Sequence, residues 1–231
     1  MGMISNNLQT VTAQIRAACA DCGRNPNEVT LLAVSKTWGA DAVRQAYAAG
    51  QRHFGENYIA EGVDKIAQLA DLSDALWHMI GPIQSNKTRA VAEHFAWVHS
   101  VDQLKTAQRL SAQRPSYLPA LQICLQVNID GGVNKSGVPP SALPVLADAV
   151  HALPHLQLRG MMVIPEPAVD FAAACAVFGQ AYTLFSALQK QFSSVDTLSM
   201  GMSADMAAAV QCGSTMVRVG TAIFGQRTAR V

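Results

Sequence analysis

Residues 31–37 read LLAVSKT, an apolar run that ends in Ser35, Lys36 and Thr37. A segment this apolar belongs inside a folded protein, yet it carries a lysine amine at its own end. Similar short apolar runs recur along the chain, with helical patterns between them. They predict eight strands, at residues 29–34, 53–55, 76–80, 97–101, 121–129, 156–163, 197–200 and 216–220.

Helical segments separate these strands. They are predicted at residues 41–49, 58–69, 87–94, 102–112, 141–152, 171–192 and 204–211. A further helix, capped by Ser5 and Asn6, precedes the first strand and has Leu8, Val11 and Ile15 on its apolar face. This alternation predicts an α/β fold, a single (β/α)8 TIM barrel with an extra N-terminal helix. No linker or shift in composition divides the chain, so we expect residues 1–231 to form one domain.

Composition argues against nucleic-acid and membrane partners. The 17 basic and 16 acidic residues give a net charge of +1, without the basic block that nucleic-acid binding requires. Residues 171–189 carry no charge and are long enough to span a membrane. However, Phe171, Phe178 and Phe185 recur at helical spacing with polar residues between them. We therefore expect one apolar face on a helix of a soluble protein.

The cysteines indicate a reducing compartment. Their number, five, is odd and they are scattered, which favours free thiols and a cytoplasmic location over a disulfide framework. Cys19 and Cys22 form a CxxC pair, but a zinc site needs two more ligands at matching spacing. Packing within a helix is therefore the favoured role of this pair.

Lys36 is the first candidate for chemistry, because active sites of such barrels form at the carboxyl ends of the strands. It shares one face of its strand with Leu32 and Val34. Desolvation in the mouth of the barrel would favour a neutral amine, which can attack a carbonyl and form a Schiff base. The alternative is a lysine that reaches solvent or pairs with Glu56.

The loops after the last two strands predict a phosphate site. Ser203 stands at the predicted N-terminus of helix 204–211, where backbone N–H groups and the helix dipole favour an anion. Gly220 and Thr221 follow the last strand and offer an open backbone and a hydroxyl. Barrels of this type commonly bind phosphate in these two loops, although an ordinary helix cap and turn would use the same residues. Together with Lys36, they indicate a phosphorylated aldehyde.

Arg218, in the last strand, narrows the choice of ligand. A guanidinium is a permanent donor, so it would keep a pyridine nitrogen that it faces unprotonated. The pyridine ring would then be a weak electron sink. Such a site suits the holding of pyridoxal phosphate better than the stabilisation of a carbanion.

Seven stretches resemble the pyridoxal phosphate homeostasis protein family, a single-domain relative of the alanine racemase barrel. They are AVSKT (33–37), FGENY (54–58), HMIGPIQSNK (78–87), VNIDGGVNKSG (127–137), GMMVIP (160–165), LSMGMSADM (198–206) and VRVGTAIFG (217–225). By this resemblance, Lys36 holds the cofactor, Arg218 faces its ring nitrogen and Asn57 lies beside the ring. The same resemblance implies phosphate contacts from Ser203, Gly220 and Thr221.

The resemblance implies a cytosolic protein that binds pyridoxal 5'-phosphate and regulates its supply, without an established catalytic reaction. Apo forms of enzymes that use the cofactor are the expected recipients. Lys135 matches a lysine position of the family, but a turn such as DGGVNKSG often carries a solvated lysine, so we assign it no role.

Two enzyme classes remain as alternatives. The first is a racemase-like enzyme that uses the same cofactor on amino acids. Racemases with this barrel carry a second, β-rich domain, which we do not expect here because the chain ends about ten residues after the eighth strand. The second is a phosphosugar isomerase or Schiff-base aldolase, which would explain Lys36 and the phosphate site but not Arg218.

Overall fold

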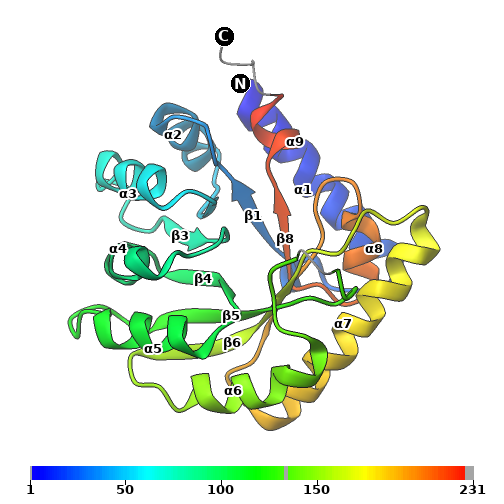
Figure 1. Ribbon diagram of the computed structural model, residues 1–231. Coiled ribbons are helices and arrows are strands. Elements are labelled where there is room, and N and C mark those ends of the chain that lie inside the picture. The colour runs from blue at the N-terminus through cyan, green and yellow to red at the C-terminus, as the bar shows by residue number, and fades with distance from the viewer. Residues whose placement is uncertain (1, 133–134, 227–231) are drawn as a thin grey trace.

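The computed structural model describes residues 2–132 and 135–226 and shows a closed barrel of parallel strands in the order β1 to β8. The barrel closes where β8 pairs with β1 (Figure 1). The strands are β1 (Thr30–Val34), β2 (His53–Glu56), β3 (Leu76–Met79), β4 (Trp97–Val101), β5 (Leu121–Val127), β6 (Leu156–Val163), β7 (Thr197–Ser199) and β8 (Met216–Val219). The predicted (β/α)8 barrel is therefore confirmed.

Helices surround the strands and form the outer layer of the barrel (Figure 1). They are α1 (Met3–Asp21), α2 (Ala40–Ala48), α3 (Ile59–Gln68), α4 (Thr88–His94), α5 (Leu104–Gln113), α6 (Leu143–His151), α7 (Phe171–Gln191), α8 (Met206–Gln211) and α9 (Thr221–Phe224). The extra N-terminal helix is present as α1, which packs against α8 and α9. Its start was predicted wrongly: Gly2 is the N-cap, and Ser5 and Asn6 lie inside the helix. The apolar face extends back to the buried Ile4, so the helix begins before the predicted caps.

A second boundary also differs from the prediction. Helix α8 begins at Met206 and has only six residues, with Asp205 at the N-cap position that was predicted for Ser203. The physical reason is a separate turn before the helix. The Met202 amide donates to Asp205 Oδ1 at 2.6 Å, and the Asp205 amide donates back to the Met202 carbonyl. These bonds hold residues 202–205 outside the helix.

The main hydrophobic core lies between the strands and the helices. Phe54, Val98 and Leu125 face outward from the barrel and belong to the same core as helical side chains such as Phe178 and Phe185. Helix α7 is long and apolar enough to cross a membrane by length and composition. Its buried stripe nevertheless packs into this core, as the helical spacing predicts for Phe178 and Phe185. Phe171, predicted on the same face, is 51% exposed because it is the first residue of the helix.

The interior of the barrel is different in character, because polar side chains fill much of it. A small apolar cluster of Trp97, Cys124 and Met162 is separate from the main core. Buried among the strands are also His78, His99, Ser199 and Arg218. Branched apolar residues dominate the interior of most such barrels, so this polar filling calls for a specific explanation.

The cysteines occupy packing positions. All five are free thiols, and Cys19 is fully buried in the core beneath α1. Cys22 ends the same helix, and its Sγ lies 3.1 Å from the Ala18 carbonyl oxygen. Within the described residues, no group of three or more histidines, cysteines or carboxylates is placed to hold a metal ion.

Candidate functional site

The predicted site residues come together on one side of the barrel mouth. Lys36 follows β1, Asn57 follows β2, Ser203 follows β7, and Arg218 with Gly220 and Thr221 belongs to β8 and the turn after it. These four strands are neighbours in the order β7–β8–β1–β2. Because parallel strands end at the same edge, the topology joins residues that lie up to 185 positions apart, Lys36 and Thr221.

Lys36 stands in a sharp turn directly above β1. Leu32 of this strand is the register partner of Arg218. Lys36 is four residues further on, at most about 13 Å along the strand direction at roughly 3.3 Å per residue. The side chain of Lys36 is half-buried, and the next residue, Thr37, has a left-handed backbone with φ 69°.

A network of ion pairs and hydrogen bonds, which we call the turn clamp, holds this turn. It consists of Ser35, Thr37, Glu56, Glu61 and Lys65. The Glu56 carboxylate accepts from the Ser35 hydroxyl and from the Lys65 ammonium, both at 2.6 Å. Lys65 also donates to the Ser35 carbonyl at 2.8 Å and to Glu61 at 3.0 Å. Glu61 in turn accepts from the Thr37 amide. Both residues that flank Lys36 are thus tied to β2 and α3.

Two opposing effects act on the pKa of Glu56 in the turn clamp. Glu56 is completely buried and Lys65 is 3% exposed. Burial raises the pKa of Glu56, and the bonds from Lys65 and Ser35 act against this rise. One carboxylate oxygen of Glu56 is buried without a partner in the described residues, whereas the other holds both donors. The sequence suggested Glu56 as an alternative partner of Lys36; the structure shows it bonded to Lys65 and Ser35.

Arg218 lies at the floor of the mouth and is 5% exposed. It donates from Nη1 to the Ser199 hydroxyl at 2.8 Å and from Nη2 to the Val163 carbonyl at 3.0 Å. Burial lowers the pKa of Arg218 to about 10, which leaves it charged at neutral pH. Both of its acceptors are neutral oxygen atoms.

Asn57 has a polar atom that a ligand could satisfy. Its side-chain oxygen is buried and has no hydrogen-bond partner among the described residues. The Asn128 side-chain oxygen, just beyond the end of β5, is in the same condition. Buried polar atoms are normally paired, so unpaired ones near the end of the strands fit a site for a polar ligand.

The predicted phosphate residues border the open side of the mouth. A Cβ added at Gly220 would come within 3.1 Å of the Val34 carbonyl oxygen, so the chain passes close to β1 there. Thr221 and Ala222 begin α9, and the first N–H groups of a helix have no acceptor within it. Ser203 and Thr221 are exposed. The helix-cap role predicted for Ser203 is absent, but its place after β7 next to β8 is as expected.

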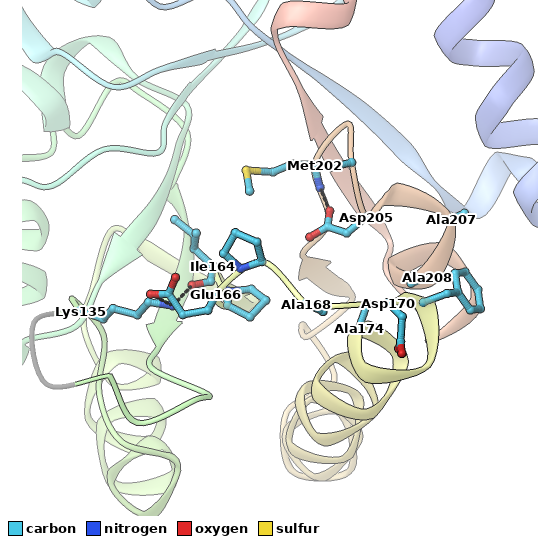
Figure 2. Close-up of a pocket in the computed structure, with 14 residues that line it drawn as sticks. Lys135, Ile164, Glu166, Ala168, Asp170, Ala174, Met202, Asp205, Ala207 and Ala208 are labelled. Atoms are coloured by element: carbon cyan, nitrogen blue, oxygen red, sulfur yellow. Dashed lines mark hydrogen bonds and ion pairs between the residues drawn. The ribbon is translucent and has the colours of Figure 1, made fainter.

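A pocket of about 530 Å³ adjoins this region, between the loop after β6 and the loop after β7 (Figure 2). Met202 and Asp205 line it on one side and Ile164 and Glu166 on the other. Lys135 lies at its edge and forms ion pairs with Asp130 at 2.6 Å and Glu166 at 3.0 Å. The sequence suggested a solvated lysine; the structure shows a paired one.

Several polar residues of this region were missed by the sequence analysis. They are the half-buried His53 of β2, the buried His78 of β3 and His99 of β4, together with Ser199 and Lys65. A signal was available for the histidines, because strand alternation places His78 and His99 on the inward face of β3 and β4. For Lys65, helical spacing indicates only a bond to Glu61 four residues before it. Its bond to Glu56 depends on how α3 packs on β2.

The fold and the site define a class of protein, the alanine racemase type of barrel. Residues 7–228 match the family described as alanine racemase, N-terminal domain. The solved alanine racemase of Corynebacterium glutamicum superposes with a TM-score of 0.69 at 18% identity, covering 99% of this chain and 63% of that one. At this identity the likeness shows the fold alone.

Closer relatives specify the family within that class. A pyridoxal phosphate homeostasis protein of Pseudomonas aeruginosa is 57% identical over 227 residues, 98% of this chain and 97% of that protein. The Escherichia coli K12 protein of the same description is 51% identical and covers 98% of both chains. The chain belongs to the pyridoxal phosphate homeostasis protein family. PipY of Synechococcus elongatus, 41% identical over 96% of this chain and all of its own, superposes with TM-scores of 0.85 without pyridoxal phosphate and 0.81 with it bound.

Proposed function

We propose that this protein binds pyridoxal 5'-phosphate in the mouth of its barrel and takes part in the homeostasis of this cofactor inside the cell. One observation carries the proposal: Lys36 follows β1, and Arg218 lies on the adjacent β8, level with Leu32, which is four residues before the lysine. The spacing suits a small aromatic ring that has an aldehyde toward Lys36 and a nitrogen toward Arg218. The relative PipY, solved with pyridoxal phosphate bound, supports the same assignment.

Each predicted residue has a distinct role in this proposal. Bound pyridoxal phosphate supplies an aldehyde that an amine can attack. Lys36 provides that amine, and the turn clamp orients it. Asn57 lies beside the ring, where its unpaired oxygen finds a donor. Arg218 donates a hydrogen bond toward the ring nitrogen and excludes a proton from it, because a guanidinium does not accept one back.

The phosphate is assigned to the loops after β7 and β8. The backbone N–H groups at the start of α9 are donors for it, and the Thr221 hydroxyl is adjacent. Ser203 contributes its hydroxyl from the exposed turn after β7. A side chain at Gly220 would crowd the Val34 carbonyl oxygen, so glycine gives the closest approach of the two chain segments there.

We infer that the protein holds and supplies the cofactor without turning over a substrate. The inference rests on Arg218, because a ring whose nitrogen is not protonated withdraws electrons weakly from an attached group. Apo forms of enzymes that need the cofactor are the proposed recipients. The five free cysteines support a reducing, cytoplasmic setting, and we propose that residues 1–231 act as one cofactor-binding unit.

Reduction with borohydride tests the assignment of Lys36. The protein is incubated with pyridoxal phosphate, reduced, digested and mapped by mass spectrometry. We expect a pyridoxyl group on Lys36, its loss in Lys36→Arg, and its retention in Lys190→Arg, a change on the solvent side of α7. Labelling confined to other lysines would overturn the site. Racemisation of an amino acid that Lys36→Arg abolishes would overturn the non-catalytic role.

A further inference from the structure

A chain of side-chain hydrogen bonds crosses the interior of the barrel from β2 to β8. His53 Nδ1 lies 3.0 Å from His78 Nε2, and His78 Nδ1 lies 2.9 Å from His99 Nε2. His99 Nδ1 is 3.0 Å from Ser199 Oγ, which accepts from Arg218 at 2.8 Å. We call His53, His78, His99 and Ser199 the histidine chain. Its inner end meets the residue proposed to face the cofactor ring, and His53, at its outer end, is half-buried at the start of β2.

Arg218 determines the direction of every bond in the histidine chain. A guanidinium can only donate, so the Ser199 oxygen accepts from it. The only other hydrogen-bond partner of the Ser199 hydroxyl among the described residues is His99 Nδ1, so we assign the Ser199 proton to that nitrogen. A neutral imidazole that accepts at Nδ1 carries its proton on Nε2. His99 therefore donates from Nε2 to His78 Nδ1. In the same way, His78 donates from Nε2 to His53 Nδ1. Each of the three rings therefore carries its proton on Nε2.

The surroundings keep these rings uncharged. Burial lowers the pKa of His99 to about 3, with a smaller contribution from the Arg218 charge. Burial also lowers the pKa of His78 well below its ordinary value and the pKa of His53 less strongly. The other charged or titratable groups near the histidine chain and Arg218 are Cys124, Arg159 and Asp205. The Asp205 charge acts to raise the pKa of Arg218, but Asp205 is bonded to the Met202 amide and forms no ion pair with Arg218 in the described residues. Arg159 lies over the ring of Trp97, which also stacks with His78, and it is bonded to Asp196.

Arg218 is thus a buried cation without a carboxylate bonded to it in the described part of the chain. Buried charges are normally paired with an opposite charge, because a charge without compensation is costly to bury. In the histidine chain, every acceptor faces Arg218 and every donor faces away from it. The aligned dipoles place their negative ends at the guanidinium, and hydrogen bonds in such a row polarise one another.

We propose that the histidine chain serves Arg218 as a neutral substitute for a counter-ion, with Ser199 and His99 as its positioning residues. A carboxylate at the same place would cancel the charge of the guanidinium. The histidine chain stabilises that charge without cancelling it and leaves it directed at the mouth of the barrel. The value of this arrangement for cofactor binding rests on the proposed function, whereas the direction of the chain does not.

Nitrogen NMR on the cofactor-free protein tests the direction. In protein labelled with ¹⁵N-histidine, we expect His53, His78 and His99 to be neutral with the proton on Nε2 at pH 7. His94 and His151, which lie outside the chain, serve as internal references. A proton on Nδ1 of His78 or His99, or a charged ring at either position, overturns the proposal. This measurement uses the unmodified chain and therefore does not depend on any variant folding.

A matched pair of variants tests the electrostatic role. Ser199→Asp places a carboxylate beside Arg218, and Ser199→Asn places a neutral group of the same size there. We expect Ser199→Asp to bind pyridoxal phosphate at least tenfold more weakly than Ser199→Asn, measured by the change in absorbance on binding. Equal affinities overturn the counter-ion role. Failure of the unmodified protein to bind pyridoxal phosphate would overturn the proposed function instead, and would leave the NMR result standing.

Discussion

At the scale of single residues, the turn clamp contains a buried ion pair and holds both residues flanking Lys36, the lysine proposed to bind the cofactor. Lys65 contacts Glu56, Glu61 and the carbonyl of Ser35. These contacts hold the strained backbone at Thr37 and with it the direction in which Lys36 leaves β1. A buried pair of this kind adds little stability over apolar residues, but breaking it leaves an uncompensated charge.

Removal of one partner of this pair should therefore be costly. Lys65→Met leaves the Glu56 carboxylate buried alone, and we expect it to lower the free energy of unfolding by about 3–5 kcal/mol in urea titrations. The double variant Lys65→Met/Glu56→Gln removes both charges and should recover a large part of the loss. A loss below about 1 kcal/mol in Lys65→Met would contradict a stabilising role for the pair.

At the scale of elements, closure of the barrel depends on close backbone contact between β6 and β7. Gly160 has φ 150°, and a Cβ there would come within 1.8 Å of the Thr197 carbonyl oxygen. The register of β5 against β6 also shifts next to it, between Ile123 and Cys124. A glycine is required here because another strand occupies the space of a side chain.

Two glycine substitutions test whether the close contact at Gly160, rather than the general effect of replacing glycine by alanine, determines stability. Gly160→Ala should force β6 and β7 apart and lower the melting temperature strongly or prevent folding. In Gly179→Ala, on α7, the new Cβ meets nothing within 4 Å, so the gain in helix propensity should stabilise the protein by up to about 1 kcal/mol. Thermal unfolding followed by circular dichroism measures both. Similar melting temperatures for the two variants would refute the close contact.

At the scale of the whole molecule, the barrel has two buried regions that differ in polarity. The layer between strands and helices is apolar and supplies the main hydrophobic stabilisation. The space inside the strands carries buried polar groups, the histidine chain and Arg218. Because the inner space contains buried histidines, the stability of the whole protein depends on pH.

The sign of that dependence follows from the buried histidines. Unfolded histidines titrate near 6.5, whereas burial lowers the pKa of folded His99 to about 3. Below pH of about 6.5 the unfolded chain binds protons that the folded chain does not, so stability is lost as the pH falls. Each such histidine contributes a slope of up to about 1.4 kcal/mol per pH unit. Urea titrations between pH 7 and 5 measure this slope.

Variants at two histidines test whether His99 causes the loss of stability at low pH. His99→Gln should reduce the slope by removing one buried ring, and His94→Gln should leave it unchanged because that ring is exposed. If His99→Gln loses stability as steeply as the unmodified protein over this range, the assignment of the effect to His99 is wrong.

The amino-acid sequence by itself determined the barrel and the residues at its mouth. The reason is that both depend on local patterns: apolar runs of strand length, helical spacing between them, and polar residues where each strand ends. Lys36, Arg218, Gly220 and Thr221 could be selected in this way because parallel strands all end at the same edge, whereas Asn57 was selected only through the family resemblance. The helix boundaries at Ser5 and Ser203 failed because competing local contacts, a buried Ile4 and the Asp205 turn, determine where those helices begin.

Only the tertiary structure decided which polar groups pair inside the barrel. The bond of Lys65 to Glu56 depends on the packing of α3 on β2, and the histidine chain requires β4 and β7 to face each other across the closed barrel. A hydrogen bond forms only within a few tenths of an ångström of its proper length, and no sequence pattern specifies distances across an interior. The sequence therefore indicated the residues proposed to bind the cofactor, whereas the closed barrel determined which buried groups form hydrogen bonds around them.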